Sequence, residues 1–187
     1  MNRILLSVLV FAACAAAAAA DDLEQRAATS RAAAKTLLEA LQATVTEAAQ
    51  SKGPVHAIGV CNEQALPITR RVSQELGIEV GRTSHKLRNP KNAPDAWEEK
   101  VLADFAQRKA AGEDLTKMEF YEVVEQDGSR VFRYMKAIPL GAVCYNCHGG
   151  RLRPEVAAKL DELYPQDQAR GFNVGDLRGA FTIKQPM

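Results

Sequence analysis

Two cysteines separated by two residues are followed directly by a histidine, in the segment Cys144-Tyr145-Asn146-Cys147-His148. Thiols at this spacing can each add across a vinyl group of one porphyrin, and the adjacent histidine is then held at the iron as an axial ligand. The segment therefore predicts covalent attachment of one haem of the c type. Such an attachment constrains the fold, because the rest of the chain has to enclose the cofactor and supply a ligand for the other side of its iron.

Two other chemistries use a Cys-x-x-Cys pair. Structural zinc takes four ligands, usually from two such pairs, and the chain contains only one. A dithiol redox pair is expected early in a thioredoxin-like unit, after a first strand, whereas Cys144 lies near the C-terminus. Haem attachment is the interpretation that fits the position of the motif.

The first twenty residues have the pattern of a secretory signal peptide. Arg3 gives the positive start, residues 4–13 form an apolar stretch, and the alanine run to Ala20 provides a small-residue cleavage site. We therefore expect residues 1–20 to be removed and the protein to be periplasmic. A lipoprotein attached through Cys14 is the alternative, although Phe11 fits poorly where such signals prefer leucine.

The charge balance and the cysteine content narrow the range of possible functions and partners. The chain has 24 Lys and Arg against 23 Asp and Glu, and loss of Arg3 with the leader makes the two counts equal. A balanced surface gives no reason to expect nucleic acid or an anionic membrane as a partner. Residues 21–187 are long enough for one domain with its own core. Cys61 is the cysteine that remains once the haem has used two, and an unpaired thiol in an oxidising compartment calls for an explanation.

The segment 21–53 is expected to form a long amphipathic helix. Its apolar residues recur at steps of three and four: Ala34, Leu38, Leu41, Val45 and Ala48. Gly53 and Pro54 are expected to end it. We expect the apolar stripe to pack on the same chain, and a homodimer through this helix is the alternative. Residues 55–60 are interpreted as a short apolar segment before Cys61, followed by a second helix from near Pro67 to Gly77.

Residues 78–184 contain patterns typical of helices and of strands in alternation. Residues 78–80 are expected to form a short strand, and Asp95 and Glu98 have the spacing of a capping box that opens a helix. Asp127-Gly128 lies between two runs rich in aromatic and β-branched residues, 118–125 and 130–138, and this predicts a hairpin. A helix over 154–164 and a strand over 179–184 follow. This order predicts an α+β domain with an antiparallel sheet and flanking helices.

The ligand on the second side of the iron would decide the chemistry. The candidates are Cys61, His56, His85, Met118 and Met135. The two methionines lie in the hairpin strands, where packing is the expected role. Methionine ligation would raise the potential and suit an electron carrier, whereas an anionic thiolate would lower it. Ligation by Cys61 would account for the odd thiol and protect it from oxidation.

The segment 82–94 is polar, contains several turn-forming residues and carries three cations, Arg82, Lys86 and Arg88. Haem propionates are carboxylates, for which guanidinium groups are good partners. We therefore expect Arg82 and Arg88 to lie at the cofactor, either on a propionate or behind a ligand. A solvated basic loop is the alternative.

Several segments together resemble a known family, the periplasmic c-type haem domains with a PAS-like fold that occur as small secreted proteins and as sensor modules. The resemblance rests on these segments: Val60-Cys61, residues 65–68, residues 82–98, residues 144–149, Tyr164-Pro165, Asp167, Ala169, Gly171 and residues 175–179. It implies a PAS-like haem domain over residues 54–187, with the iron held between His148 and Cys61. His85 stands where the family has an apolar residue, so His85 is kept as the alternative ligand.

These observations favour a redox or small-ligand sensor, for NO or CO, with a low-potential haem that acts through a partner protein. A periplasmic monohaem electron carrier is the alternative. A haem enzyme such as a peroxidase would need an open site with a positioned acid or base, for which His56 or His85 is the available residue. We do not expect an enzyme.

Overall fold

The computed structural model describes the backbone of residues 2–187 and the side chains of residues 20–187. The elements run α1(Asn2–Leu76), β1(Glu79–Thr83), η1(Pro90–Asn92), α2(Ala96–Ala110), β2(Glu119–Gln126), β3(Ser129–Pro139), α3(Ala142–His148), α4(Pro154–Leu163) and β4(Leu177–Pro186). The expected signal peptide and the Cys14 lipoprotein alternative fall outside the described side chains. Within the described residues, no helix is both long enough and apolar enough to span a membrane.

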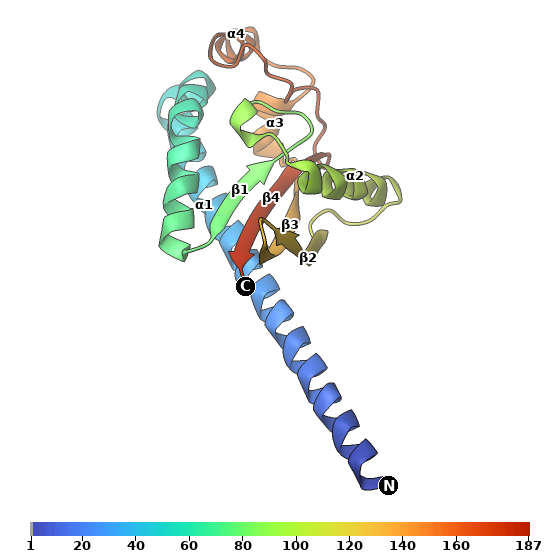
Figure 1. Ribbon diagram of the computed structural model, residues 1–187. Helices are drawn as coiled ribbons and strands as arrows, with labels where there is room; N and C mark the ends of the chain where they lie inside the picture. Colours follow the sequence, from blue (N-terminus) through green and yellow to red (C-terminus); the bar gives the residue numbers. More distant parts are fainter. Residues whose placement is uncertain (1) are drawn as a thin grey trace.

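The four strands form one antiparallel sheet in the order β1-β4-β3-β2 (Figure 1). The hairpin of β2 and β3 turns at Asp127 and Gly128, whose φ angles of 52° and 76° both lie in the left-handed region. A two-residue turn of that kind matches the right-handed twist of the strands it joins. The predicted hairpin, the antiparallel sheet, the flanking helices and the α+β class are confirmed.

α1 consists of two arms with a break at Lys52 and Gly53, whose φ and ψ angles are not helical. The first arm ends at the break and the second arm runs from Pro54 to Leu76. Residues 55–60, interpreted as a short apolar segment before a second helix, belong to this second arm, and the helix start predicted near Pro67 is wrong because Pro67 lies inside the arm. The missing N–H of Pro67 leaves the carbonyl of Glu63 without its helical donor, and both residues are exposed, so water can satisfy it.

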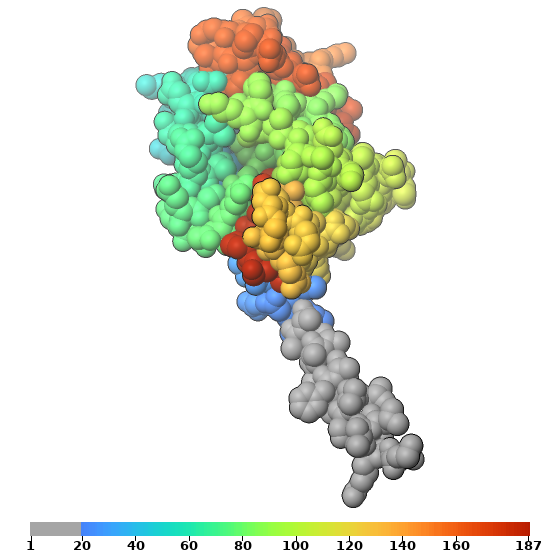
Figure 2. Space-filling model, viewed as in Figure 1, coloured from blue at the N-terminus to red at the C-terminus, as the bar shows by residue number. Residues whose placement is uncertain are grey.

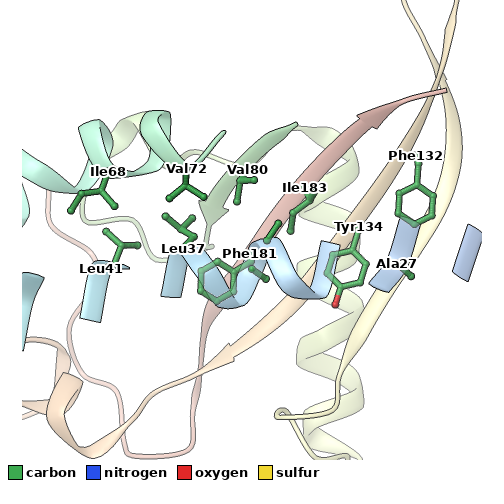
Figure 3. Packing of buried hydrophobic residues seen from close by; sticks show 12 residues of the cluster. Ala27, Leu37, Leu41, Ile68, Val72, Val80, Phe132, Tyr134, Phe181 and Ile183 are labelled. Atoms are coloured by element: carbon green, nitrogen blue, oxygen red, sulfur yellow. The ribbon is translucent and has the colours of Figure 1, made fainter. Parts of the chain in front are cut away.

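The main core lies between α1 and one face of the sheet (Figure 3). Leu37 and Leu41 of the first arm meet Ile68 and Val72 of the second arm and Ile183 of β4, within the same cluster. The stripe predicted for residues 21–53 therefore packs on its own chain, as preferred. The homodimer stays a prediction.

Glu119 of the hairpin joins the first arm of α1 to the sheet and is also bonded within the hairpin. Arg31 donates to both oxygens of Glu119 on β2, at 2.6 to 3.1 Å. The hydroxyl of the buried Tyr134 donates to the same carboxylate at 2.7 Å. Burial raises the pKa of Tyr134, and Glu119 raises it further, so the phenol stays protonated and keeps donating.

α2 covers the opposite face of the sheet, where Val101 and Phe105 pack with Met118 and Met135. The predicted capping box is present: the Asp95 side chain accepts from the N–H of Trp97 and of Glu98, and Glu98 accepts from the N–H of Asp95. Met118 and Met135 are both fully buried in this second core, which confirms the packing role expected for them.

The α1 arms predict a first test of the fold. Replacing Leu37, which is fully buried between the arms and the sheet, by alanine should lower the free energy of unfolding by about 2 to 5 kcal/mol, because a large cavity is left in the main core. Urea denaturation followed by far-UV circular dichroism measures this. Thr36→Ala, at an exposed neighbour on the same arm, is the control and should change stability by less than about 0.5 kcal/mol. Equal stability of the two variants would show that the arm does not belong to the core.

Candidate cofactor site

The Cys-x-x-Cys-His segment forms α3, a single short helix that lies with α4 beyond one end of the sheet (Figure 1). Its two cysteines are anchored in different places. Cys144 packs beside the Leu140, Ala169 and Phe172 cluster, and Cys147 packs beside the Ile58, Val156, Leu160 and Tyr164 cluster. Both thiols, like that of Cys61, are free and half-buried. The helix thus presents two cysteines at fixed positions.

His148 is held in one orientation by the segment that follows α4. Its Nδ1 lies 2.8 Å from the carbonyl oxygen of Ala169, and because a carbonyl only accepts, Nδ1 must carry the proton and donate. The N–H of Phe172 donates to the His148 carbonyl at 3.0 Å, and the Phe172 ring lies edge-on to the imidazole. Nε2 is thereby left unprotonated, as a metal ligand requires.

The charge state of His148 agrees with that geometry. Burial, together with the positive charges of Arg88 and Arg178, lowers the pKa of His148 to about 3. The imidazole is therefore neutral at any physiological pH and has a lone pair for a metal ion.

Gly149, directly after His148, is required by close packing. A Cβ at this position would lie 2.7 Å from the carbonyl oxygen of Tyr145 and 2.8 Å from its ring. Any side chain would push the backbone away from Tyr145 and disturb the contacts that orient His148. The glycine is therefore part of the geometry that holds the imidazole.

Arg88 joins three segments around this helix. Its guanidinium donates to the carbonyl of Cys147 at 2.6 Å, to the carbonyl of Ala169 at 3.2 Å and to both oxygens of Asp167 at 3.2 Å. The Asp167 side chain is only 1% exposed. In Figure 2 the segment 81–95, in green, lies beside the second arm of α1 and below α4. Arg88 thus links that segment to α3 and to the turn after α4. Of the two positions predicted for it, this contact fits the one behind the attachment segment, on the Cys147 carbonyl.

Asp167 is the carboxylate that holds both Arg88 and the acceptor of His148 in position. Burial alone would raise its pKa, but hydrogen bonds from Arg170 and Arg88 outweigh that effect and hold the pKa below its usual value. Its Oδ1 also accepts from the N–H of Ala169 at 2.9 Å, which shapes the turn that presents the Ala169 carbonyl to His148. One buried carboxylate therefore places both Arg88 and the acceptor of His148.

Cys61 lies on the second arm of α1, one turn after Ile58, which packs in the same cluster as Cys147. Burial raises the pKa of the Cys61 thiol, the positive charge of Arg82 is the main influence that lowers it, and the thiols of Cys147 and Cys144 raise it further. The next residue, Asn62, lies close to Tyr164, the residue directly after α4. A cavity of about 160 Å³, lined in part by Asn62, Arg88 and Tyr164, lies beside these groups. The fold thus brings Cys61 close to the two cysteines of α3.

The other candidate ligands are placed differently. The side chains of His56 and His85 are exposed, and Met118 and Met135 are buried in the core beneath α2. Arg82 is half-buried on β1, on the side of Cys61. Arg178 is also at the site, although it was not predicted from the sequence. Nothing in the local sequence marks it, because its position depends on the pairing of β4 with β3.

Comparison with known proteins supports the fold. A family model described as Tll0287-like matches residues 20–186. The crystal structure of the cyanobacterial heme-protein Tll0287 has a similar fold, with a TM-score of 0.60 and 24% sequence identity over 89% of this chain and 96% of that chain. No curated protein matches the chain. The shared fold therefore includes nearly all the residues outside the expected leader.

The buried ion pair predicts a pH-dependent stability. A pKa that is lowered in the folded state stabilises the protein above the unfolded value of about 3.9, and this contribution is lost as the pH falls through the folded pKa. Asp167→Asn should therefore cost about 3 to 5 kcal/mol near neutral pH, because Arg88 is left without its counter-ion. It should also weaken the fall in stability below about pH 4. Urea denaturation over a pH series measures both effects.

Asp161→Asn is the matched control, since Asp161 is 69% exposed and pairs with the same Arg170. Its effect should stay within about 0.5 kcal/mol. If Asp167→Asn and Asp161→Asn had the same unfolding free energy at every pH, Asp167 would not have the organising role assigned to it.

Proposed function

The chain belongs to the Tll0287-like family, and on that premise we propose that it is an exported protein with one c-type haem, held by Cys144 and Cys147 and ligated by His148 and Cys61. The observation that carries the proposal is the convergence of Cys61, from α1, on the cysteines of α3. That the cyanobacterial protein of similar fold is a heme-protein supports it.

The residues present fit a haem in three respects. The two cysteines of α3 are free and at the spacing that thioether attachment needs. His148 is neutral, with Nδ1 engaged and Nε2 free. Cys61 provides a soft donor close by, and Arg82 provides a positive charge that favours its thiolate. The set would therefore supply two attachment points and two iron ligands from two separate parts of the chain.

Our preferred role is redox or small-ligand sensing in the periplasm. A haem held in this way supplies a low-potential iron couple and, if the thiolate is lost on reduction, a position for NO or CO. The residue that would move is Cys61, and its helical arm continues into Ile68 and Val72 of the main core. A shift at Cys61 would therefore reach the sheet, which in a PAS-like domain is the natural route to a partner protein. We do not propose an enzymatic activity.

The alternative role is a periplasmic monohaem electron carrier. The observation that favours it is the surface position of α3, on which Val143 is 68% exposed and Asn146 is also exposed. A redox partner could approach the attachment cysteines there. The midpoint potential separates the two roles, because thiolate ligation favours ferric iron and a low value, whereas an ordinary carrier with neutral ligands has a higher one.

Covalent attachment and export are tested together by intact mass. Protein purified from the periplasm of an expression host with haem-attachment machinery should have the mass of residues 21–187 plus one haem, retained after denaturation. Double replacement of Cys144 and Cys147 by alanine should abolish this retained mass, whereas Cys61→Ala should leave it in place. Haem that is lost from the wild type on denaturation would contradict c-type attachment, and a retained leader would contradict the predicted cleavage.

Ligation by Cys61 is tested by spectroscopy and potentiometry. Cys61→Ala should remove the thiolate features of the ferric absorption and EPR spectra. It should also raise the midpoint potential by on the order of 100 mV, a fraction of the ~0.8 V that axial ligands span. His85→Ala is the matched control and should change neither property, because His85 is exposed. If His85→Ala changed the spectra and Cys61→Ala did not, the histidine would be the ligand.

A further inference from the structure

The site contains more positive charge than its own carboxylates balance. Arg82, Arg88 and Arg178 all lie close enough to act on the pKa values of the cysteines or of His148. The acid among them is Asp167, which already accepts from Arg88 and Arg170. Half-buried guanidinium groups close to one another repel, and keeping them charged is costly without an anion. Two of the three arginines, Arg82 and Arg178, have no carboxylate partner within the described residues.

A β-bulge places Arg178 in the site. On β3, Ile138 pairs with Gly179 and Pro139 pairs with Leu177, so Arg178 is an extra residue on β4 without a partner. A bulge of this kind redirects the side chain of the extra residue. The Arg178 guanidinium is directed to the Ser84 hydroxyl at 3.0 Å, the Lys86 carbonyl at 3.2 Å and the face of the Phe172 ring. Phe172 is the ring that lies edge-on to His148.

Both hydrogen bonds of Arg178 use the same nitrogen, Nη1, and both go to neutral oxygens. The guanidinium has five N–H donors, so most of its donor capacity is unused by residues 20–187. Burial, together with Arg88 and Arg82, lowers the pKa of Arg178 to about 10. The side chain is thus oriented and charged, and it lies where a negative group would be favourable.

Arg82 reaches the same site from the neighbouring strand. It pairs in register with Phe181 of β4, and its side chain lies near Cys61 and Tyr164. Among the described side chains it has neither a hydrogen-bond acceptor nor a carboxylate partner, and burial lowers its pKa. Arg88 differs from both, because its donors are taken by Asp167 and by two carbonyl groups.

We infer that Arg82 and Arg178 form a two-point carboxylate site that takes the two haem propionates, while Arg88 positions α3 and does not contact the cofactor. The inference rests on the proposed function, since it assigns residues to the haem proposed there. Two propionates carry the two negative charges that these arginines lack. Guanidinium groups also bind carboxylates with two parallel hydrogen bonds, which would fix the porphyrin edge opposite the attachment cysteines.

The test uses the haem-loaded protein and the variants Arg178→Gln and Arg82→Gln. Each should shift the propionate bending bands in the resonance Raman spectrum and lower the midpoint potential, because removing a cation near the haem favours ferric iron. The double variant should give the larger shift of potential. Arg178→Lys and Arg82→Lys keep the charge and should restore most of the potential, which a merely structural role would not predict.

Arg71→Gln is the matched control, because Arg71 is 61% exposed on the second arm of α1 and pairs with Glu75. It should leave the propionate bands and the potential unchanged. Wild-type protein that carries haem, with unchanged bands and potential in both glutamine variants, would overturn this inference alone. Wild-type protein without haem would overturn the proposed function and this inference with it.

Discussion

The buried ion pair between Arg88 and Asp167 is the contact on which the geometry of the site depends. Through it, one carboxylate fixes a guanidinium that holds the Cys147 carbonyl, and the same carboxylate shapes the turn whose Ala169 carbonyl orients His148. A buried pair of this kind contributes little net stability, because desolvation of the two ions offsets their attraction. The ion pair instead fixes positions: three segments far apart in the chain can adopt only one relative arrangement in which the two charges are paired.

The scaffold beneath the site follows from different forces. The two arms of α1 and one face of the sheet bury a continuous apolar core, and α2 closes the opposite face. Burial of this kind is non-directional, so it sets which faces meet without setting the position of any single polar atom. The directional contacts are concentrated at the end of the sheet where α3 and α4 lie. The apolar core therefore supports the fold, and the polar contacts refine the site.

An unbalanced group of arginines beside neutral thiols and a neutral histidine is costly for a folded chain alone. Natural proteins keep such an arrangement where a ligand supplies the missing charge, since strain at a functional site is offset by binding. In this protein the excess of positive charge and the free donor atoms of His148 and Cys61 lie in one region. The haem that we propose would supply two negative charges for these arginines and an iron ion for these donor atoms.

Features set by near neighbours could be predicted from the sequence. The Asp127-Gly128 turn, the Asp95 capping box and the spacing of Cys144, Cys147 and His148 depend on residues within a few positions of one another, so their physics is visible locally. The continuous second arm of α1 was missed, because Pro67 favours a helix start locally, and packing against the sheet and α4 overrides that preference. The role of Arg178 was missed for a related reason: a bulge in the pairing of β4 with β3 directs it, and Asp167 and Arg88 meet across 79 positions. The sequence alone determined which groups could attach a haem, and the tertiary structure decided which of the remaining polar groups meet them, because only long-range burial and strand register bring those groups together.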